Sequence, residues 1–141
     1  MPRVYFTDRD LGKQFPARLR EAGLQVERHA DHFAPATPDE VWLPEAGRRG
    51  WVVLTHDERI RYKPNELAAV MRHRVLLLVV QGQAPYPQLA KWFVQTLPRI
   101  EAFLAEHQAP FIAKVQRPTP KDLAARPDAP GRVVLWVPAR P

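Results

Sequence analysis

Two uninterrupted apolar runs constrain the fold of this chain more than any other feature. Residues 51–54 (WVVL) and 75–80 (VLLLVV) contain no polar side chain. A strand with one face in water alternates apolar and polar residues, whereas a short continuous apolar run is typical of a parallel strand covered on both faces. The two runs therefore predict a sheet enclosed between two layers of helices.

Strand and helix patterns alternate along the rest of the chain. Leu11, Phe15 and Leu19 recur every four residues, which is the spacing of one apolar helical face. Thr37, Pro38 and Glu40 predict the start of another helix, with a capping box. Strands are expected at 3–7, 24–28, 51–54, 75–80 and 111–115, and helices at 11–21, 37–50, 65–73 and 87–107. The strand at 24–28 alternates apolar and polar residues, which places it nearer an edge, and the polar segment 29–37 predicts a loop. Because right-handed crossovers place helices on both faces, this order predicts a three-layer α/β/α domain with a mostly parallel central sheet.

The composition changes after residue 117. The segment PTPKDLAARPDAPG is rich in proline and charge, which predicts a linker or an extended arm. Residues 132–137 (RVVLWV) predict a short strand that pairs with the sheet edge or with another chain. We therefore expect one domain at 1–117 and a Pro-rich C-terminal extension at 118–141.

Composition and charge narrow the classes of function. The 141 residues suffice for one domain, and the lack of cysteine excludes disulfides, Cys-based zinc sites and a thiol nucleophile. The N-terminus MPRVYFTDRD has no apolar signal core, and no run approaches the length of a membrane span, so we expect a cytoplasmic protein without a membrane partner. The net charge of +6 favours a polyanion as partner, most commonly nucleic acid.

Three acids occupy positions that an α/β sheet brings to one crevice. Asp8 follows the first strand, Asp57 follows the third, and Asp39 lies in the first turn of the helix that leads into the third strand. The functional crevice of an open α/β sheet lies at the carboxyl ends of its strands. Converging carboxylates repel one another unless a cation lies between them, and Mg²⁺ or Mn²⁺ prefers such all-oxygen sites.

A carboxylate-held metal suits the hydrolysis of a phosphodiester bond. The ion lowers the pKa of a bound water and neutralises charge on the phosphate oxygens. Basic residues beside the acids would bind the backbone of RNA; the candidates are Arg9, Arg59, Arg61 and Lys63. Trp42 and Tyr62, which lie in polar surroundings, are candidates for stacking on bases.

Each acid also has a purely structural explanation. Asp8 and Asp10 are favoured as helix caps, Asp39 stabilises a helix first turn, and Asp57 can open a turn. The cluster H-x-D-H, formed by His29, Asp31 and His32, is either a transition-metal site or part of a solvated loop. The sequence therefore leaves both the functional and the structural explanation open for the acids and for this cluster.

The segments FTDRDLG, TPDEVWL, WVVLTHDERIRYKP and PFIAKV together resemble the PIN-like domains grouped with VapC-type toxins. The resemblance covers residues 3–117 and is most specific in LTHDERIRY. It implies an α/β/α domain with metal-dependent ribonuclease activity, and it matches Asp8, Asp39 and Asp57 to the family's acids, with Asp10 as an additional metal ligand. It also implies the toxin of a type II toxin–antitoxin pair, with an antitoxin protein as partner, and a possible homodimer.

One departure from the family pattern concerns a fourth acid. PIN nucleases usually hold an acid after a later strand, but VLLLVV is followed by Gln81, Gly82 and Gln83. The departure implies an acidic cluster with fewer carboxylates than is usual in the family, and therefore weaker metal binding or reduced activity. Catalysis is therefore an expectation that the resemblance supports.

Three other functions remain open at this point. A receiver-like phosphoacceptor domain would use Asp8, Asp10, Asp57 and Lys114 but would leave Asp39 without a role. A phosphohydrolase would use Asp8-Arg9-Asp10 as a D-x-D motif, although no hydroxyl residue follows it closely. A non-catalytic nucleic-acid or partner-binding module would use the same fold, with the acids as caps.

Overall fold

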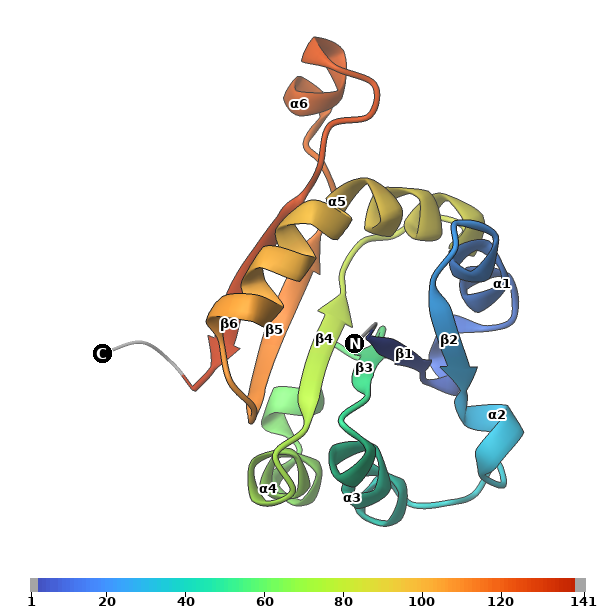
Figure 1. Ribbon diagram of the computed structural model, residues 1–141, viewed down its shortest axis with the longest axis vertical. Helices are drawn as coiled ribbons and strands as arrows, with labels where there is room; N and C mark the ends of the chain where they lie inside the picture. The colour runs from blue at the N-terminus through green and yellow to red at the C-terminus, as the bar shows by residue number, and fades with distance from the viewer. Residues whose placement is uncertain (1–2, 139–141) are drawn as a thin grey trace.

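The computed structural model describes residues 3–138, with the side chain of Arg61 left out of the description. Six strands form one sheet in the order β2-β1-β3-β4-β5-β6 (Figure 1). The first five strands are parallel to their neighbours, and β6 pairs antiparallel with β5. The strands are β1 (Val4–Thr7), β2 (Gln25–Arg28), β3 (Val52–Thr55), β4 (Leu76–Val80), β5 (Phe111–Gln116) and β6 (Arg132–Val137).

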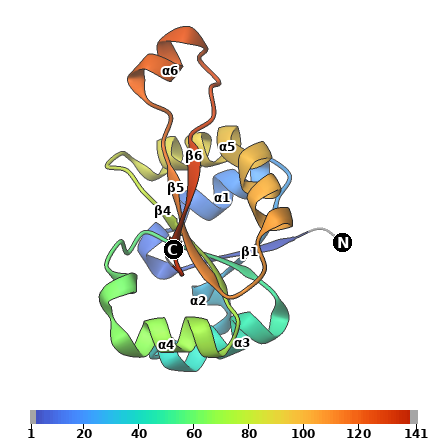
Figure 2. The ribbon, with the colours of Figure 1, turned by 90° about the vertical axis from the view of Figure 1, so that its left-hand side faces the viewer.

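Helices cover both faces of the sheet. Figures 1 and 2 show α1 beside α5 on one side of the molecule and α3 beside α4 on the other. The α-helices are α1 (Gln14–Glu21), α2 (His29–His32), α3 (Asp39–Arg49), α4 (Pro64–Arg72), α5 (Tyr86–Glu106) and α6 (Pro120–Ala125). Two short 3₁₀ turns, η1 (Arg9–Leu11) and η2 (Ile60–Tyr62), follow β1 and precede α4.

Successive side chains of the central strands enter two separate cores. Tyr5 of β1 packs with α1 and α5, while its neighbour Phe6 packs with α3 and α4. In β4, Leu78 joins the first core and Leu77 the second, and both are fully buried. Because side chains alternate across a strand, a strand between two cores must be apolar throughout. The two apolar runs therefore have the physical origin that the sequence indicates.

The predicted three-layer α/β architecture is confirmed, and so is the placement of β2 at an edge. The strand predicted at 132–137 is also present, and it joins the sheet edge as β6. The Pro-rich extension predicted for the C-terminal segment is not shown, since the described part of that segment forms α6 and β6. The proposed division of the chain at residue 117 stays a prediction.

Two local predictions are wrong. Residues 29–37 are not entirely loop, because α2 occupies the first four of them. The capping box at Thr37 and Glu40 is absent: α3 starts at Asp39 with Pro38 as its N-cap, and no side chain caps it. A capping box does occur at α6, between Thr119 and Asp122, in the segment expected to be a linker.

None of the described helices is both long and apolar enough to cross a membrane.

Gly47 permits the closest approach between α3 and the turn that leads from α4 into β4. A Cβ atom at this position would lie 2.1 Å from the backbone oxygen of His73. We expect Gly47→Ala to destabilise the fold by about 1–3 kcal/mol, although alanine is the better helix former. Urea unfolding measures the effect, and Val41→Ala on the exposed face of the same helix is the matched control. A more stable Gly47→Ala protein would contradict this packing.

Candidate active site

The pairing of β1 with β3 brings two acid-bearing segments to the carboxyl edge of the sheet. The register places Thr7 opposite Leu54, and the backbone N–H of Asp8 donates to the Leu54 carbonyl at 2.9 Å. Asp8 therefore lies beside Thr55, the last residue of β3. The predicted proximity of the ends of strands one and three is confirmed.

A threonine hydroxyl joins the carboxylates of Asp8 and Asp10. Thr55 Oγ1 lies 3.2 Å from Asp8 Oδ2 and 2.9 Å from Asp10 Oδ2. A hydroxyl carries one proton, so it donates to one carboxylate at a time or is shared between both. The two carboxyl groups thus meet at a single donor, and they compete for it.

Hydrogen bonds from His56 and Tyr86 hold Asp10 in place. The backbone N–H of His56 donates to both of its carboxylate oxygens, at 3.0 and 3.1 Å. Its carbonyl accepts a hydrogen bond from the Tyr86 hydroxyl at 2.8 Å. Gly12 has a φ of +67°, and a Cβ there would lie 3.0 Å from the Tyr86 ring, so glycine leaves room for this contact. The geometry of Asp10 is therefore set by β3 and α5 together.

Burial and like charge raise the pKa values of both acids. Burial first, and then the carboxylate of Asp10, raise the pKa of Asp8 to about 6, with a smaller contribution from Asp39. Burial also raises the pKa of Asp10, against the hydrogen bonds from His56 and Thr55, and Asp57 adds to the rise. Acids perturbed by desolvation and by a specific neighbour in this way cluster at functional sites.

Asp57 lies in a different environment because it has its own counterion. Burial alone would raise its pKa, but the ammonium of Lys63 and the backbone N–H of Arg59 bind the carboxylate and lower the pKa overall. The guanidinium of Arg59 lies 3.7 Å away, with its side chain largely in solvent. Asp57 is thus an ionised acid beside two exposed cations.

Asp39 is held by a tryptophan at the start of α3. The indole N–H of Trp42 donates to Asp39 Oδ1 at 3.0 Å. Trp42 is only 1% exposed, so its proposed role in base stacking is wrong: it belongs to the core between α3, α4 and the sheet. Asp39 approaches Asp8 closely enough to raise its pKa.

Arg9 lies between the acids and α2. Its guanidinium donates to His29 Nδ1 at 2.9 Å and to the Phe33 carbonyl at 2.7 Å. Burial, and then the charge of Arg9, lower the pKa of the His29 imidazole. These two acceptors hold the guanidinium in place against α2 and the residue that follows it.

The H-x-D-H cluster does not converge. His29 is buried and accepts from Arg9, whereas His32 contacts Glu27 and Asp31 pairs with Arg28. Each side chain has a separate local partner, which favours the structural explanation over a shared transition metal.

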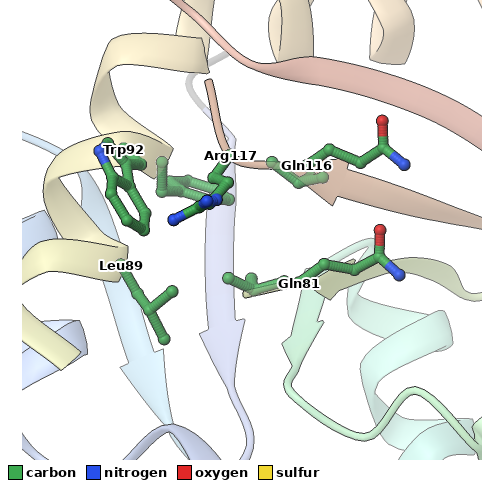
Figure 3. Close-up of a pocket in the computed structure, with 8 residues that line it drawn as sticks. Gln81, Leu89, Trp92, Gln116 and Arg117 are labelled. Carbon is green, nitrogen blue, oxygen red and sulfur yellow. The ribbon is translucent and has the colours of Figure 1, made fainter. Parts of the chain in front are cut away.

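Glutamine residues lie at the carboxyl ends of β4 and β5, and Gln81 follows β4 where the family pattern usually has an acid. Figure 3 shows Gln81 and Gln116 extending in the same direction from neighbouring strands. Gln81 Nε2 donates to Glu58 Oε1 at 2.7 Å, so an acid from the β3–α4 connection reaches this part of the edge. Arg117 lies over the Trp92 ring, 5.3 Å from its centroid, on the other side (Figure 3).

The four candidate acids therefore divide into a joined pair and two neighbours. Asp8 and Asp10 share Thr55, while Asp39 and Asp57 have separate hydrogen-bond partners and act on the pair through charge. In the part of the chain that the structure describes, no group of three or more His, Cys, Asp or Glu residues is arranged to hold a metal.

The pair by itself nonetheless matches what Mg²⁺ takes from a protein. Mg²⁺ keeps several waters and is usually bound through one or two carboxylates together with substrate phosphates. The donors of Asp8 and Asp10 are all oxygen, and their raised pKa values report a site where a cation would relieve charge repulsion. The residues present thus fit one such ion.

The sequence analysis did not identify three residues that contact the site: Thr55, Tyr86 and Glu58. Thr55 carries a weak signal, because a hydroxyl residue at the end of a buried strand faces the carboxyl edge of the sheet. Tyr86 and Glu58 carry none: Tyr86 lies 76 residues from Asp10, and Glu58 reaches Gln81 only through the fold.

A family model described as a PIN like domain matches residues 3–82, which is more than half of the chain. No curated protein and no solved structure matches the chain significantly. The matched segment contains all four candidate acids.

The raised pKa of Asp8 predicts a pH dependence of stability. The ordinary value is 3.8 and the folded value about 6, so ionisation of Asp8 disfavours the folded state, and the penalty grows as the pH rises between these values. In metal-free buffer we compare the free energy of unfolding of Asp8→Asn with that of the wild type. We expect the difference to shift in favour of the variant by about 2–3 kcal/mol as the pH rises from about 4 to about 7. Urea unfolding across this range measures the difference.

The matched control is Asp128→Asn, at an exposed carboxylate that pairs with Arg126 on the surface. Its stability should follow the wild type at every pH. An Asp8→Asn curve parallel to the wild type would show that Asp8 ionises normally in the folded protein.

Proposed function

Because this chain belongs to the PIN-like domain family, we propose that it is a metal-dependent endoribonuclease that hydrolyses RNA phosphodiester bonds. PIN domains are generally nucleases, they bind nucleic acids, and they typically use divalent metals. The single observation that carries the proposal is the half-buried pair Asp8 and Asp10, joined through Thr55 at the carboxyl edge of the sheet.

Four acids of this chain are assigned to the metal site. Asp8 and Asp10 would hold Mg²⁺ or Mn²⁺ directly, and Asp39 and Asp57 would add negative charge or complete the ligand set. The bound ion supplies a water of lowered pKa and neutralises charge on the phosphate oxygens. Thr55 and the His56 N–H orient the carboxylates, which reduces the reorganisation needed when substrate arrives.

Basic residues on the β3–α4 connection would hold the substrate backbone. The Lys63 ammonium and the Arg59 guanidinium both lie against Asp57, and a phosphate placed there would meet two cations. Arg9, whose guanidinium binds His29 and the Phe33 carbonyl, is assigned to the same role from its place between Asp8 and Asp10 in the chain. Arg61 is assigned to the same role from its place in the sequence.

A toxin role is the finer form of this proposal. The resemblance to VapC-type toxins supports it, with a small antitoxin protein as the partner that would block the acidic edge. Under this proposal, expression of the wild-type chain arrests growth of a bacterial host, and expression of Asp10→Asn does not.

The receiver-like alternative has one feature in its favour and one against it. The order β2-β1-β3-β4-β5 is the doubly wound order that receiver domains also use. However, the Lys114 ammonium lies over the Trp136 ring, 5.0 Å from its centroid, and Lys63 is the lysine that binds Asp57. The non-catalytic module stays the main competitor, since it needs only the fold and the basic surface.

Cleavage of RNA tests the proposal directly. We expect Mn²⁺-dependent cleavage of a labelled RNA by the wild type, and a loss of more than about a hundredfold in Asp8→Asn, Asp10→Asn and Asp57→Asn. Circular dichroism checks that each variant folds, and Asp128→Asn should retain full activity. Undiminished cleavage by Asp10→Asn would refute the assignment, and binding without cleavage by the wild type would favour the module.

A further inference from the structure

Two aromatic residues and a lysine gather where β6 meets the connection between β3 and α4. We propose that Tyr62, Trp136 and Lys114, here called the aromatic platform, form a site that binds the bases of single-stranded RNA. This inference rests on the proposed ribonuclease function and adds to it a base-binding site outside the acid pair.

Trp136 contacts the other two side chains in the structure. The rings of Tyr62 and Trp136 meet edge to face, with centroids 6.2 Å apart and an interplanar angle of 86°. The Lys114 ammonium lies 5.0 Å from the Trp136 centroid, within the range of a cation–π interaction. The cation and the two rings therefore form one continuous surface contributed by β5, β6 and η2.

The surface around the aromatic platform includes two exposed large hydrophobic side chains. Tyr62 is 69% exposed, and Val134, which pairs with Lys114 across β5 and β6, is 38% exposed. They are two of the three large hydrophobic residues that are exposed in the described part of the chain. An apolar surface gathered at one place, with cations at its margin, is typical of an interaction site.

The location of the platform follows from the sheet. Ile112 of β5 packs in the core with α3 and α4, so Lys114, two residues later, points to the same face. Trp136 and Val137 of β6 only partly pack against that core. Figure 2 shows the end of β6 directed toward α4, so the platform lies at the margin of the helical layer.

Charge argues for a nucleic acid as the occupant. Lys114 belongs to the platform. In the connection between β3 and α4, Arg59 precedes Tyr62 and Lys63 follows it. Stacking aromatics combined with cations that track a backbone is the arrangement that binds single strands without sequence preference. In a duplex the bases already stack on one another, so the platform selects unpaired RNA.

The platform is continuous with the acidic edge. Lys63, the residue after Tyr62, binds the carboxylate of Asp57. A strand whose base stacks on Tyr62 would place its neighbouring phosphate near Lys63 and Asp57. Two of the three platform residues, Lys114 and Trp136, lie beyond the segment matched by the family model, so the match does not account for them.

Binding without metal separates this proposal from catalysis. Fluorescence anisotropy in EDTA would compare three probes: a labelled single-stranded RNA, the same strand with abasic sugars, and its duplex. We expect the wild type to prefer the single strand with bases. Tyr62→Ala and Trp136→Ala should weaken its binding about tenfold or more, while binding of the abasic strand should stay unchanged.

Two further variants control for folding and for the chemistry of stacking. Tyr62→Phe keeps the ring and should bind within about twofold of the wild type, since the stacking surface is retained. Val41→Ala removes a comparably exposed apolar side chain from α3 and should have no effect. Urea unfolding verifies that all the variants are folded.

Each result has a defined meaning. Equal affinity for the normal and abasic strands, a Tyr62→Ala protein that binds as the wild type does, or no RNA binding by the wild type would overturn the platform. A change in oligomeric state without a change in RNA binding would overturn it in favour of contact between chains. Base-dependent binding in a protein that never cleaves RNA would uphold the platform and refute the ribonuclease.

Discussion

The hydrogen-bonded register between β1 and β3 is the constraint on which the rest of the site depends. It places the end of β1, with Asp8 and Asp10, beside Thr55 at the end of β3. This register is fixed by two cores at once, because Tyr5 and Phe6 enter opposite layers and a shift by one residue would exchange them. The apolar packing that stabilises the sheet therefore also sets the distance between the acids.

The acid pair works against the stability of the protein that contains it. Two half-buried carboxylates share one hydroxyl donor, and burial raises the pKa of both, with the charge of Asp10 adding to the rise at Asp8. Asp8 does cap η1, since its carboxylate accepts from the backbone N–H of Arg9 at 2.7 Å. A single capping acid, the alternative that the sequence left open, would not explain the second carboxylate at Thr55. Asp57 shows the contrast: with Lys63 as its counterion, its pKa falls instead of rising.

The sequence was sufficient for most of the fold because burial on two faces leaves a clear pattern. The apolar runs located β3 and β4, and RVVLWV located β6. It was insufficient for the parts of the site that depend on distant contacts. The hydrogen bond from Tyr86 to Asp10 and the burial of Trp42 arise only when helices pack on the sheet. Short polar helices such as α2 lack an apolar period, so the pattern concealed them.

The same distinction applies to the acids. Their position at strand ends was predictable, because the carboxyl ends of parallel strands share one edge. Which acids pair was not, since Asp10 rather than Asp39 or Asp57 joins Asp8 through Thr55. Local hydrogen bonds from Trp42 and Lys63 decide where Asp39 and Asp57 turn, and neither partner can be assigned from spacing alone.

The central claim is that Asp8 and Asp10 together bind a divalent ion, and calorimetric titration with Mn²⁺ tests it most directly. Because the pKa of Asp8 is about 6, binding near that pH should release a proton, and the observed heat should depend on the ionisation enthalpy of the buffer. We expect the wild type to bind Mn²⁺ with release of a proton, and the Asp8→Asn, Asp10→Asn double variant to lose this binding. Binding of equal strength in both proteins, or no binding in either, would contradict it.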